Sequence, residues 1–521
     1  MFKDKKLLSI LGLSFISFFS TIWIRKADLM ESRNFITARE IVTNNEWFVT
    51  TLNGQYRFEK PPLPTWLTAI IMKLTNNFSD EWLLRIPVAL ASVLLIYFIY
   101  KFVQHISKND NLAFLSSFVA TTTFMLTKVG SENAWDAYPY IFMFGSITYL
   151  VKSLNSKKNI HTILGGLFLA ASLLSKGPVA LYGMLLPFIV AYIVIYGLEE
   201  IKTNKVRIGM YFLIGLALAS IWPVAMMLKN KELFLSVMNK EKDTWSSKHV
   251  KGFFFYANYF IFMGSWIFFS VAAIFRKWNL KDKGEHKLFK FGILWTILTF
   301  ILLSLVKMKK ERYGFPMYIV SSIPLGIILN YYLNNNWNTL KKFDRVLFYV
   351  QSVFISIVCV GSIGIILWKR PAYYYLIVPF IALMIYMFRK SKIDKDIFKK
   401  KIVYLSGFLL VLVNCNLTWI IERDIRGKGS ERLKPLETLQ TVKKGYKIYS
   451  KDFGIQDVWS VGQLIHTLDE NTTLPEAFYI LSSSSNLDLK NDYKIQSKET
   501  YSRFKDDKDL IYLYKVTNED E

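Results

Sequence analysis

The sequence predicts an all-α protein that crosses a membrane many times, with about 13 spanning helices and a small α/β segment at the C-terminal end. Of its 521 residues, 52% are hydrophobic, with 41 Phe and 29 Tyr, which is more apolar than a soluble globular chain. Apolar runs of about 18 residues, each able to cross about 30 Å of hydrocarbon as a helix, recur along most of the chain. These observations exclude an ordinary soluble globular protein.

The position of each apolar run predicts one span. The spans are expected near residues 6–24, 83–103, 111–127, 137–152, 159–175, 177–197, 207–228, 253–275, 288–306, 314–333, 345–367, 371–388 and 402–420. Basic residues precede the first run, as in a signal peptide, but Trp23 and Arg25 end it where a small-residue cleavage site would stand. We therefore expect a retained helix, and an odd number of spans places the termini on opposite sides.

Lys and Arg collect in alternate loops, which predicts the orientation. With the N-terminus in the cytoplasm, the inner loops are basic and comprise residues 152–158, 202–207, 276–287, 341–345 and 389–401. The outer face then carries the segment 25–82, the loops 128–136 and 229–252, and the C-terminal tail. Topology therefore explains much of the formal net charge of +25, so membrane lipids are expected partners and nucleic acid is not.

Two domains are expected, a transmembrane domain over residues 1–421 that includes the outer loop 25–82, and a small extracytoplasmic domain over 422–521. In the tail the hydrophobic runs shorten, the charges alternate and strand-like segments occur at 447–450, 477–481 and 510–515. Cys359 and Cys415 both fall in predicted spans, so neither a disulfide framework nor a thiolate metal site is expected. The chain has no Gly-rich phosphate loop, so no nucleotide cofactor is expected.

Candidate catalytic acids stand on the outer loops. Asp28 and Glu31 precede a predicted amphipathic helix over 33–43, which would suit a helix lying on the bilayer. A carboxylate at such a place either caps the helix or acts in catalysis. Asp136, just before the fourth span, has the same two interpretations, and Trp135 beside it is a candidate platform for a sugar ring. Two acids on separate outer loops can converge on one substrate to activate an acceptor and steady a charged transition state.

Basic residues at the outer helix ends form a second group. They comprise Arg33, Arg57, Lys60, Lys176, Lys309, Lys310 and Arg312. Each one alone is an ordinary interfacial residue, but together they make an electropositive rim able to hold a phosphate. The basic loop 307–312 runs against the positive-inside pattern, so either a helix is miscounted or the loop is an anion site, and we favour the anion site. Prolines 61 and 62 would present Glu59 and Lys60 in a set direction.

These residues resemble motifs of the GT-C superfamily of lipid-carrier-dependent glycosyltransferases, and most closely the aminoarabinose (lipid A) transferase and protein mannosyltransferase-like group. The resemblance covers about residues 1–325 and rests, in family order, on Glu31-x-Arg33 with Ala38-Arg-Glu40, Asn53-Gly with Phe58-Glu-Lys-Pro-Pro-Leu63, Trp135-Asp136, Ser175-Lys-Gly177, Trp222-Pro223, His249 with Phe253 to Tyr256, and Lys309-Lys-Glu-Arg-Tyr313 before Pro316. The elements Glu-Lys-Pro-Pro and Lys-Lys-Glu-Arg-Tyr are the more specific of these.

The resemblance implies inverting transfer of a sugar from a polyprenyl-phosphate carrier to a lipid A, glycan or protein acceptor, at the periplasmic face of a bacterial inner membrane. It implies that Glu31 and Asp136 are the catalytic acids, and that Arg33, Lys60 and the group Lys309, Lys310, Arg312 and Tyr313 contact the donor phosphate. It also implies a zinc-like divalent metal site at Glu59 and His249. Many relatives have Asp-Glu where this chain has Met30-Glu31, so either Glu31 takes the role of that Asp or Asp28 does.

Two other classes of protein are alternatives to a transferase. A transporter or lipid flippase would carry ionisable residues deep inside its spans, whereas the acids of this chain gather on outer loops, which favours a transferase. A sensor or receptor would have its working part in the C-terminal tail. The residues do not identify the sugar or the acceptor.

Overall fold

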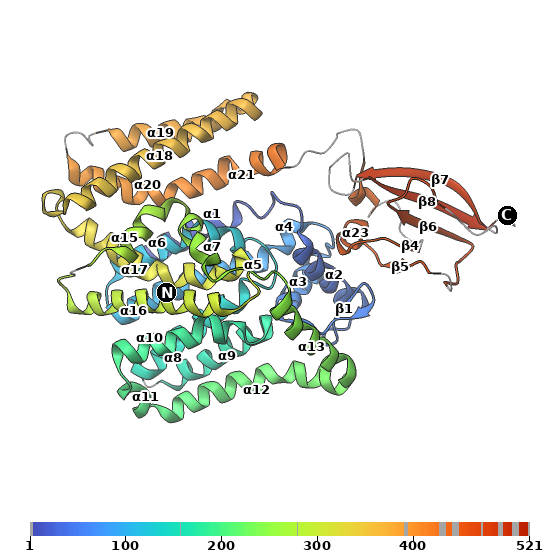
Figure 1. Ribbon diagram of the computed structural model, residues 1–521, viewed down its shortest axis with the longest axis horizontal. Helices are drawn as coiled ribbons and strands as arrows, with labels where there is room; N and C mark the ends of the chain where they lie inside the picture. Colours follow the sequence, from blue (N-terminus) through green and yellow to red (C-terminus); the bar gives the residue numbers. More distant parts are fainter. Residues whose placement is uncertain are drawn as a thin grey trace. The chain divides into compact units, whose positions relative to one another are not determined.

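The computed structural model describes residues 4–156, 158–278, 280–389, 394–426, 434–439, 447–469, 472–487, 493–502 and 510–518. Parts of the predicted inner loops 152–158, 276–287 and 389–401 lie outside these residues. The chain divides into two compact units (Figure 1). The first unit comprises Met1–Trp23, Phe58–Pro64 and Arg85–Trp419, and the second comprises Ile24–Arg57, Thr65–Leu84 and Ile420–Glu521.

The first unit is built from long apolar helices. In chain order they are α1 (Lys5–Phe19), α5 (Ile86–Ser107), α6 (Asp110–Thr121), α7 (Phe124–Gly130), α8 (Tyr138–Ser156), α9 (Asn159–Lys176), α10 (Leu186–Tyr196), α11 (Glu199–Thr203), α12 (Lys205–Lys229), α13 (Lys231–Ser247), α14 (Tyr259–Phe262), α15 (Ile267–Phe275), α16 (Lys283–Leu305), α17 (Phe315–Asn334), α18 (Lys342–Lys369), α19 (Val378–Phe388) and α20 (Lys395–Asn416). Short 3-10 and π turns join several of them, among them η2 (Phe253–Asn258) and η4 (Glu311–Gly314).

Helix α17 lies at the centre of this unit. Nearly all of its side chains are buried, and it packs against α6 and α16. Gly326 permits the close approach to α6, since a Cβ atom at that position would lie 2.5 Å from the backbone nitrogen of Ser116. Helices α8, α9 and α12 pack side by side, as Figure 1 shows. Among the described residues, six helices are long and apolar enough to cross a bilayer, or eight if the two bent pairs α6–α7 and 253–275 each count as one span.

The remaining predicted spans coincide with described helices that are shorter or less apolar, such as α1, α9 and α10. The predicted outer loop 229–252 is mostly helical, because α13 occupies residues 231–247. Asn230 begins α13 by accepting a hydrogen bond from the backbone N–H of Leu233 at 3.0 Å. The sequence did not predict α13, because its charged residues leave no apolar run.

The second unit combines the first outer loop with the tail. Its loop elements are α2 (Leu29–Asn44), the hairpin β1 (Thr51–Leu52) and β2 (Gln55–Tyr56), α3 (Leu63–Thr75), whose first two residues belong to the first unit, and α4 (Glu81–Leu84). After α21 (Thr418–Ile420), the tail contains β3 (Lys434–Pro435), β4 (Ile448–Ser450), α23 (Ile455–Val461), β5 (Ile465–Thr467), β6 (Ala477–Ser482), β7 (Tyr493–Ser502) and β8 (Leu510–Asn518).

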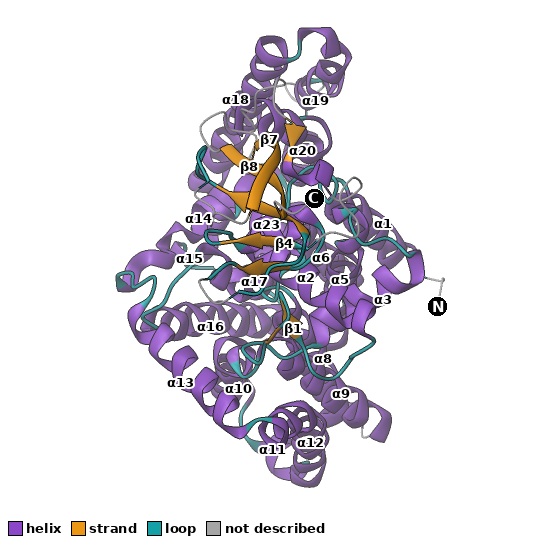
Figure 2. Ribbon diagram, turned by 90° about the vertical axis from the view of Figure 1, so that its right-hand side faces the viewer, coloured by secondary structure: helices purple, strands orange, loops and turns teal. Residues whose placement is uncertain are grey.

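The strands of the tail form a mixed six-stranded sheet in the order β3-β7-β8-β6-β4-β5 (orange in Figure 2). Strand β4 pairs in parallel with β5 and β6, whereas β8 pairs antiparallel with β6 and β7. Strands β4, β6 and β8 cover the segments predicted as strands. Tyr479, Leu481 and Leu513 are buried on the face that belongs to the core shared with the first loop.

This shared core joins the first outer loop to the tail. Phe35, Ile36 and Ile41 of α2 are buried together with Val458 and Ile465 of the tail. The loop and the tail bury their apolar side chains against each other, so the segments Ile24–Arg57 and Thr65–Leu84 group with the tail in the second unit. The helix over 33–43 was expected to lie on the bilayer. This prediction is wrong, because other parts of the protein cover its apolar residues.

Candidate functional site

Asp136 is the centre of a charged cluster in the first unit. It lies in the turn between α7 and α8, and its side chain is only 6% exposed. Lys176, the last residue of α9, donates a hydrogen bond from Nζ to Asp136 Oδ1. Arg312, in η4, donates from Nη1 to Asp136 Oδ2 at 3.4 Å. A buried carboxylate is therefore shared by two cations that come from helix ends far apart in the sequence.

The electrostatics of Asp136 follow from these neighbours. Burial acts to raise the pKa of the carboxyl group, but the charges and hydrogen bonds of Lys176 and Arg312 outweigh it and hold the pKa below its usual value of 3.8. The side chain is therefore ionised at neutral pH. A carboxylate with a lowered pKa is a weak general base, so it is better suited to orienting a group than to removing a proton from one.

Tyr313 is the fourth residue of this cluster. Lys176 Nζ lies 4.4 Å from the centroid of the Tyr313 ring, within the range of a cation–π contact. Because α9 ends at Lys176 and α17 begins after η4, the ammonium and guanidinium groups are both held at helix ends. Asp136, Lys176, Arg312 and Tyr313 are hereafter the Asp136 cluster.

The predicted phosphate ligands divide into groups with different surroundings. Lys60 Nζ lies 3.0 Å from Glu241 Oε2 of α13, and both side chains are partly exposed. Lys309 is buried and donates from Nζ to the backbone carbonyl groups of Lys251, at 3.0 Å, and Val306, at 2.6 Å. Lys309 therefore holds the loop together, whereas Lys60 and Arg312 pair with carboxylates that an anion can replace. Lys310 precedes η4, and its carbonyl group accepts from the Tyr313 N–H at 3.0 Å.

The segment around His249 pairs with the same basic loop. Val250 forms an antiparallel bridge with Met308, and the His249 carbonyl accepts from the Lys309 N–H at 3.0 Å. His249 itself has a φ of 51° and an exposed side chain. Within the described ranges, no three His, Cys, Asp or Glu side chains gather as a metal site.

Asp28, Glu31 and Arg33 belong to α2, in the second unit. Asp28 caps the helix, with its Oδ1 accepting at 2.8 Å from the N–H groups of both Met30 and Glu31. Glu31 is buried, and its Oε2 accepts from the Asp28 N–H at 3.4 Å, which closes a capping box. Of the two interpretations offered by the sequence, capping is visible for both acids. The Arg33 carbonyl accepts from Arg57 Nη1 at 2.9 Å.

The sequence did not predict two of the partners in these ion pairs, namely Lys176 as the partner of Asp136 and Glu241 as the partner of Lys60. Lys176 was placed in the basic rim but was not tied to Asp136, although its position at the end of an apolar run was the available signal. Glu241 carried no signal, because it stands among alternating charges on α13. Trp135, considered as a sugar platform, is 1% exposed and so is not available for that role.

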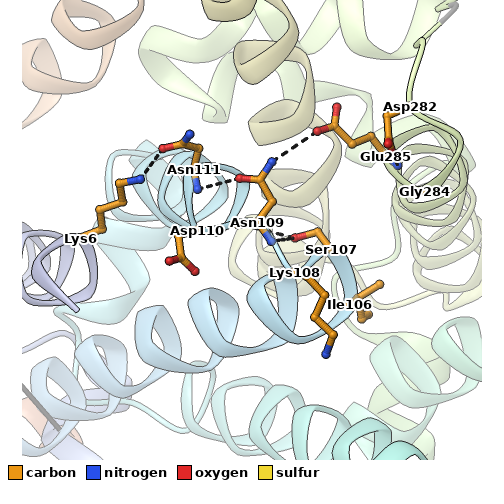
Figure 3. Close-up of a pocket in the computed structure, with 10 residues that line it drawn as sticks. All are labelled: Lys6, Ile106, Ser107, Lys108, Asn109, Asp110, Asn111, Asp282, Gly284 and Glu285. Atoms are coloured by element: carbon orange, nitrogen blue, oxygen red, sulfur yellow. Dashed lines mark hydrogen bonds between the residues drawn. The ribbon is translucent and has the colours of Figure 1, made fainter. Parts of the chain in front are cut away.

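A polar pocket of about 400 Å³ lies elsewhere in the first unit (Figure 3). It is lined by residues of α1, α5, α6 and α16, and Glu285 Oε1 accepts there from Asn109 Nδ2 at 3.5 Å. Glu285 stands in the first turn of α16, whereas Lys309 follows the far end of that helix, which is about 34 Å long. The pocket is therefore separate from the Asp136 cluster.

Comparisons with known proteins agree with this fold. The family of dolichyl-phosphate-mannose-protein mannosyltransferases matches residues 59–227. An uncharacterized protein of Aquifex aeolicus is 25% identical over 79% of this chain and 78% of its own length. The undecaprenyl phosphate-alpha-4-amino-4-deoxy-L-arabinose arabinosyl transferase of Shewanella sediminis is 25% identical over 63% of this chain. This chain spans 59% of that transferase, less than two thirds of its length.

The structural comparison covers nearly the whole chain. The crystal structure of ArnT from Cupriavidus metallidurans bound to undecaprenyl phosphate aligns over 98% of this chain and 97% of its own, with a TM-score of 0.72 and 14% identity. At that identity the likeness shows the fold. The chain therefore has the fold of ArnT, and its residues 59–227 match the mannosyltransferase family. In sequence the chain is similar to the aminoarabinose transferases over part of its length.

Proposed function

We propose that this protein is an inverting glycosyltransferase that moves a sugar from a polyprenyl-phosphate carrier to an acceptor at the outer face of the inner membrane. The acceptor is a lipid A-like lipid, a glycan or a protein. The observation that carries the proposal is the Asp136 cluster, in which a buried carboxylate holds two cations and an aromatic ring at the ends of apolar helices. The family relationship supplies the class of donor.

The negative charge that develops on the carrier phosphate during the reaction fits the positive charges of this cluster. A sugar linked to a polyprenyl phosphate is a phosphodiester with one negative charge, and the carrier leaves as a monoester with up to two. The acceptor oxygen attacks C1 of the sugar, the bond from C1 to the phosphate oxygen breaks, and its electron pair stays with the carrier. The proton of the acceptor hydroxyl passes to the released phosphate or to water. We assign Lys60, Lys176 and Arg312 to the phosphate, because fixed cations stabilise the charge that develops on the leaving group.

Asp136 and Glu31 are assigned to the acceptor. Asp136 stays ionised, so it orients an acceptor hydroxyl or amine by accepting its hydrogen bond and steadies the positive charge that develops on the sugar. Glu31 and Arg33 are proposed to serve the same reaction, as the catalytic acid and a phosphate ligand of α2. Asp28 is the helix cap, and in this proposal it acts by fixing the first turn that carries Glu31. No nucleotide takes part.

A zinc-like ion at Glu59 and His249 remains a prediction. With two protein ligands, such an ion would need the carrier phosphate to complete its coordination. A bound divalent cation would add positive charge beside that phosphate, and no step assigned above depends on it. The assignment of Lys309 and Lys310 to the phosphate also remains a prediction, and the contacts of Lys309 favour a role in holding the basic loop.

The proposed topology has about 13 spans with the Asp136 cluster and the tail in the periplasm. The support is the alternation of the basic loops and the order of the described helices. Cysteine labelling tests it in a variant whose Cys359 and Cys415 are replaced by Ala. A membrane-impermeant maleimide should label Lys307→Cys in intact cells, and should label the inner control Lys281→Cys only after lysis. Labelling of position 307 only after lysis would contradict the topology.

The function is tested by mass spectrometry of envelope lipids and glycans from cells that lack the gene. Wild-type protein should restore species heavier by one sugar residue, and Asp136→Asn should not. Asp243→Asn is the matched control, because Asp243 is an exposed acid on α13. Identical lipids and glycans with and without the gene would refute the proposal, as would full restoration by Asp136→Asn at equal protein level.

A further inference from the structure

The C-terminal sheet packs against the helix that carries Glu31 and Arg33. Both belong to the second unit, where α23 and β5 contact α2 and the β1–β2 hairpin. The contacts between them join residues about 400 positions apart in the chain. Through these contacts the tail can affect the residues of α2.

The first contact is built around Trp459 of α23. Phe35 of α2 is fully buried, with its ring centroid 5.1 Å from that of Trp459. Arg39, one turn further along α2, is 7% exposed, donates from Nη2 to the Val458 carbonyl at 3.2 Å and places its guanidinium 5.7 Å from the Trp459 ring. Trp459 in turn donates from Nε1 to Glu81 Oε1 at 2.9 Å. An arginine buried in this way has few other positions to adopt, so it fixes the rotation of α2 about its axis.

The second contact joins the hairpin to the sheet. Asn53 donates from Nδ2 to the Ile465 carbonyl at 2.8 Å, and its Oδ1 accepts from the Ile465 N–H at 3.0 Å. The side-chain amide thus pairs with both backbone groups of one residue of β5, as a neighbouring strand would. Asn53 has a φ of 52° and Gly54 a φ of 76°, the left-handed pair that a tight Asn-Gly hairpin requires.

The hairpin is tied back to α2 on its other side. Glu40 accepts from the Gly54 N–H at 3.3 Å. Arg57, which follows the hairpin, donates from Nη1 to the Arg33 carbonyl at 2.9 Å and to Thr37 Oγ1 at 2.9 Å. The sheet, the hairpin and α2 are therefore all joined by contacts with one another. Arg57 is the last residue of the loop in these contacts, and Glu59 and Lys60 follow it two and three positions later.

We infer that the C-terminal sheet is a positioning element of the transfer reaction, and that Asn53 is the positioning residue that sets the hairpin and α2 against it. This inference rests on the proposed function. The tail contacts no substrate itself; it acts through α2, which carries Glu31 and Arg33. A misplacement of about 1 Å in such groups can lower a rate by about 100-fold.

The test compares two Asn→Gly substitutions in the full-length protein. Asn53→Gly removes the two hydrogen bonds, but glycine adopts the left-handed backbone conformation without strain. Asn76→Gly is the matched control, since Asn76 has a φ of 49° in the same unit and an exposed side chain. We expect Asn53→Gly to lower kcat about tenfold. Its Kd for undecaprenyl phosphate should change less than its kcat does, because Lys60, Lys176 and Arg312, which are also assigned to the phosphate, lie outside α2. Asn76→Gly should match wild type.

Two further variants keep the test decisive if Asn53→Gly is poorly produced. Asn53→Asp keeps the acceptor from the Ile465 N–H and loses only the donor, so its kcat should be intermediate. Trp459→Phe keeps the ring packing and loses the hydrogen bond to Glu81, and should also lower kcat, with a smaller effect on the Kd. Wild-type kcat in folded Asn53→Gly, or equal loss in both Asn→Gly variants, would overturn the inference. A wild-type protein that transfers no sugar would instead refute the proposed function.

Discussion

Replacing Asp136 by Asn should change carrier binding and sugar transfer in opposite directions. The Asp136 carboxylate occupies Lys176 and Arg312, which the proposal assigns to the carrier phosphate. An incoming phosphate therefore competes with Asp136 for the same cations. Removing its charge frees both cations for the phosphate, while the orientation of the acceptor is lost.

The size of the effect follows from Coulomb's law. Two anions that share one cation lie about 6 Å apart, and at an effective dielectric constant of about 20 they repel each other by about 3 kcal/mol. Lys176 is 13% and Arg312 26% exposed, so solvent screens part of this repulsion. If about half of it survives, about 1.4 kcal/mol remains, which is a tenfold change in an equilibrium constant. Asp136→Asn should therefore bind undecaprenyl phosphate about tenfold more tightly.

The assay is a titration of purified protein in nanodiscs with undecaprenyl phosphate, at low and high salt, beside a measurement of transfer. We expect the Kd of Asp136→Asn to fall, the gain to shrink at high salt and transfer to be lost. The Asp243→Asn protein controls for the loss of any acid. Weaker binding by Asp136→Asn in a protein that remains folded would refute the reasoning, because it would show that Asp136 supports phosphate binding rather than competing with it.

Three other outcomes follow from the same contacts. Glu241→Gln should tighten binding of undecaprenyl phosphate by about 1.4-fold to fivefold, because the partly exposed Lys60–Glu241 pair is worth about 0.2–1 kcal/mol; an unchanged Kd would contradict a phosphate role for Lys60. Asp28→Ala should lower stability by about 0.5–2 kcal/mol, seen in thermal unfolding, with transfer reduced but measurable; complete loss of transfer at unchanged stability would make Asp28 catalytic instead. The pKa of Asp136 lies below 3.8 in the folded protein, so its ion pairs stabilise the fold at neutral pH and this contribution is lost as the pH falls through the lowered pKa. The difference in thermal midpoint between wild type and Asp136→Asn should therefore stay constant from about pH 5 to about pH 8 and narrow below about pH 4, and a difference that grows on acidification would contradict the charge assignment.

The parts of the fold that local pattern decides were predictable. Apolar runs give the long helices because length and composition alone determine what can cross a bilayer. Asp136 and Arg312 were both singled out, since each carries a charge at the end of an apolar run, where an unneeded charge is costly. The segments of β4, β6 and β8 were recognisable from their alternating residues.

What the sequence did not show depends on contacts between distant residues. The pairing of Lys176 with Asp136 joins two helix ends 40 residues apart, and no local pattern records it. The burial of Ile36 depends on Val458 and Ile465, so the helix that carries it resembled an interfacial helix while it was considered alone. Lys309 resembled its neighbour Lys310 in the sequence, and only the position of the carbonyl groups of Lys251 and Val306 separates their roles.

The central claim, transfer from a polyprenyl-phosphate carrier, is tested most directly by counting both products of one reaction. Membranes containing the protein are supplied with an isotopically labelled polyprenyl-phosphate sugar, and the free polyprenyl phosphate and the labelled acceptor are measured together by mass spectrometry. We expect one free carrier phosphate for each sugar transferred, and neither product from Asp136→Asn. Release of the carrier phosphate without a labelled acceptor, or movement of the intact donor across the membrane with its sugar still attached, would contradict it.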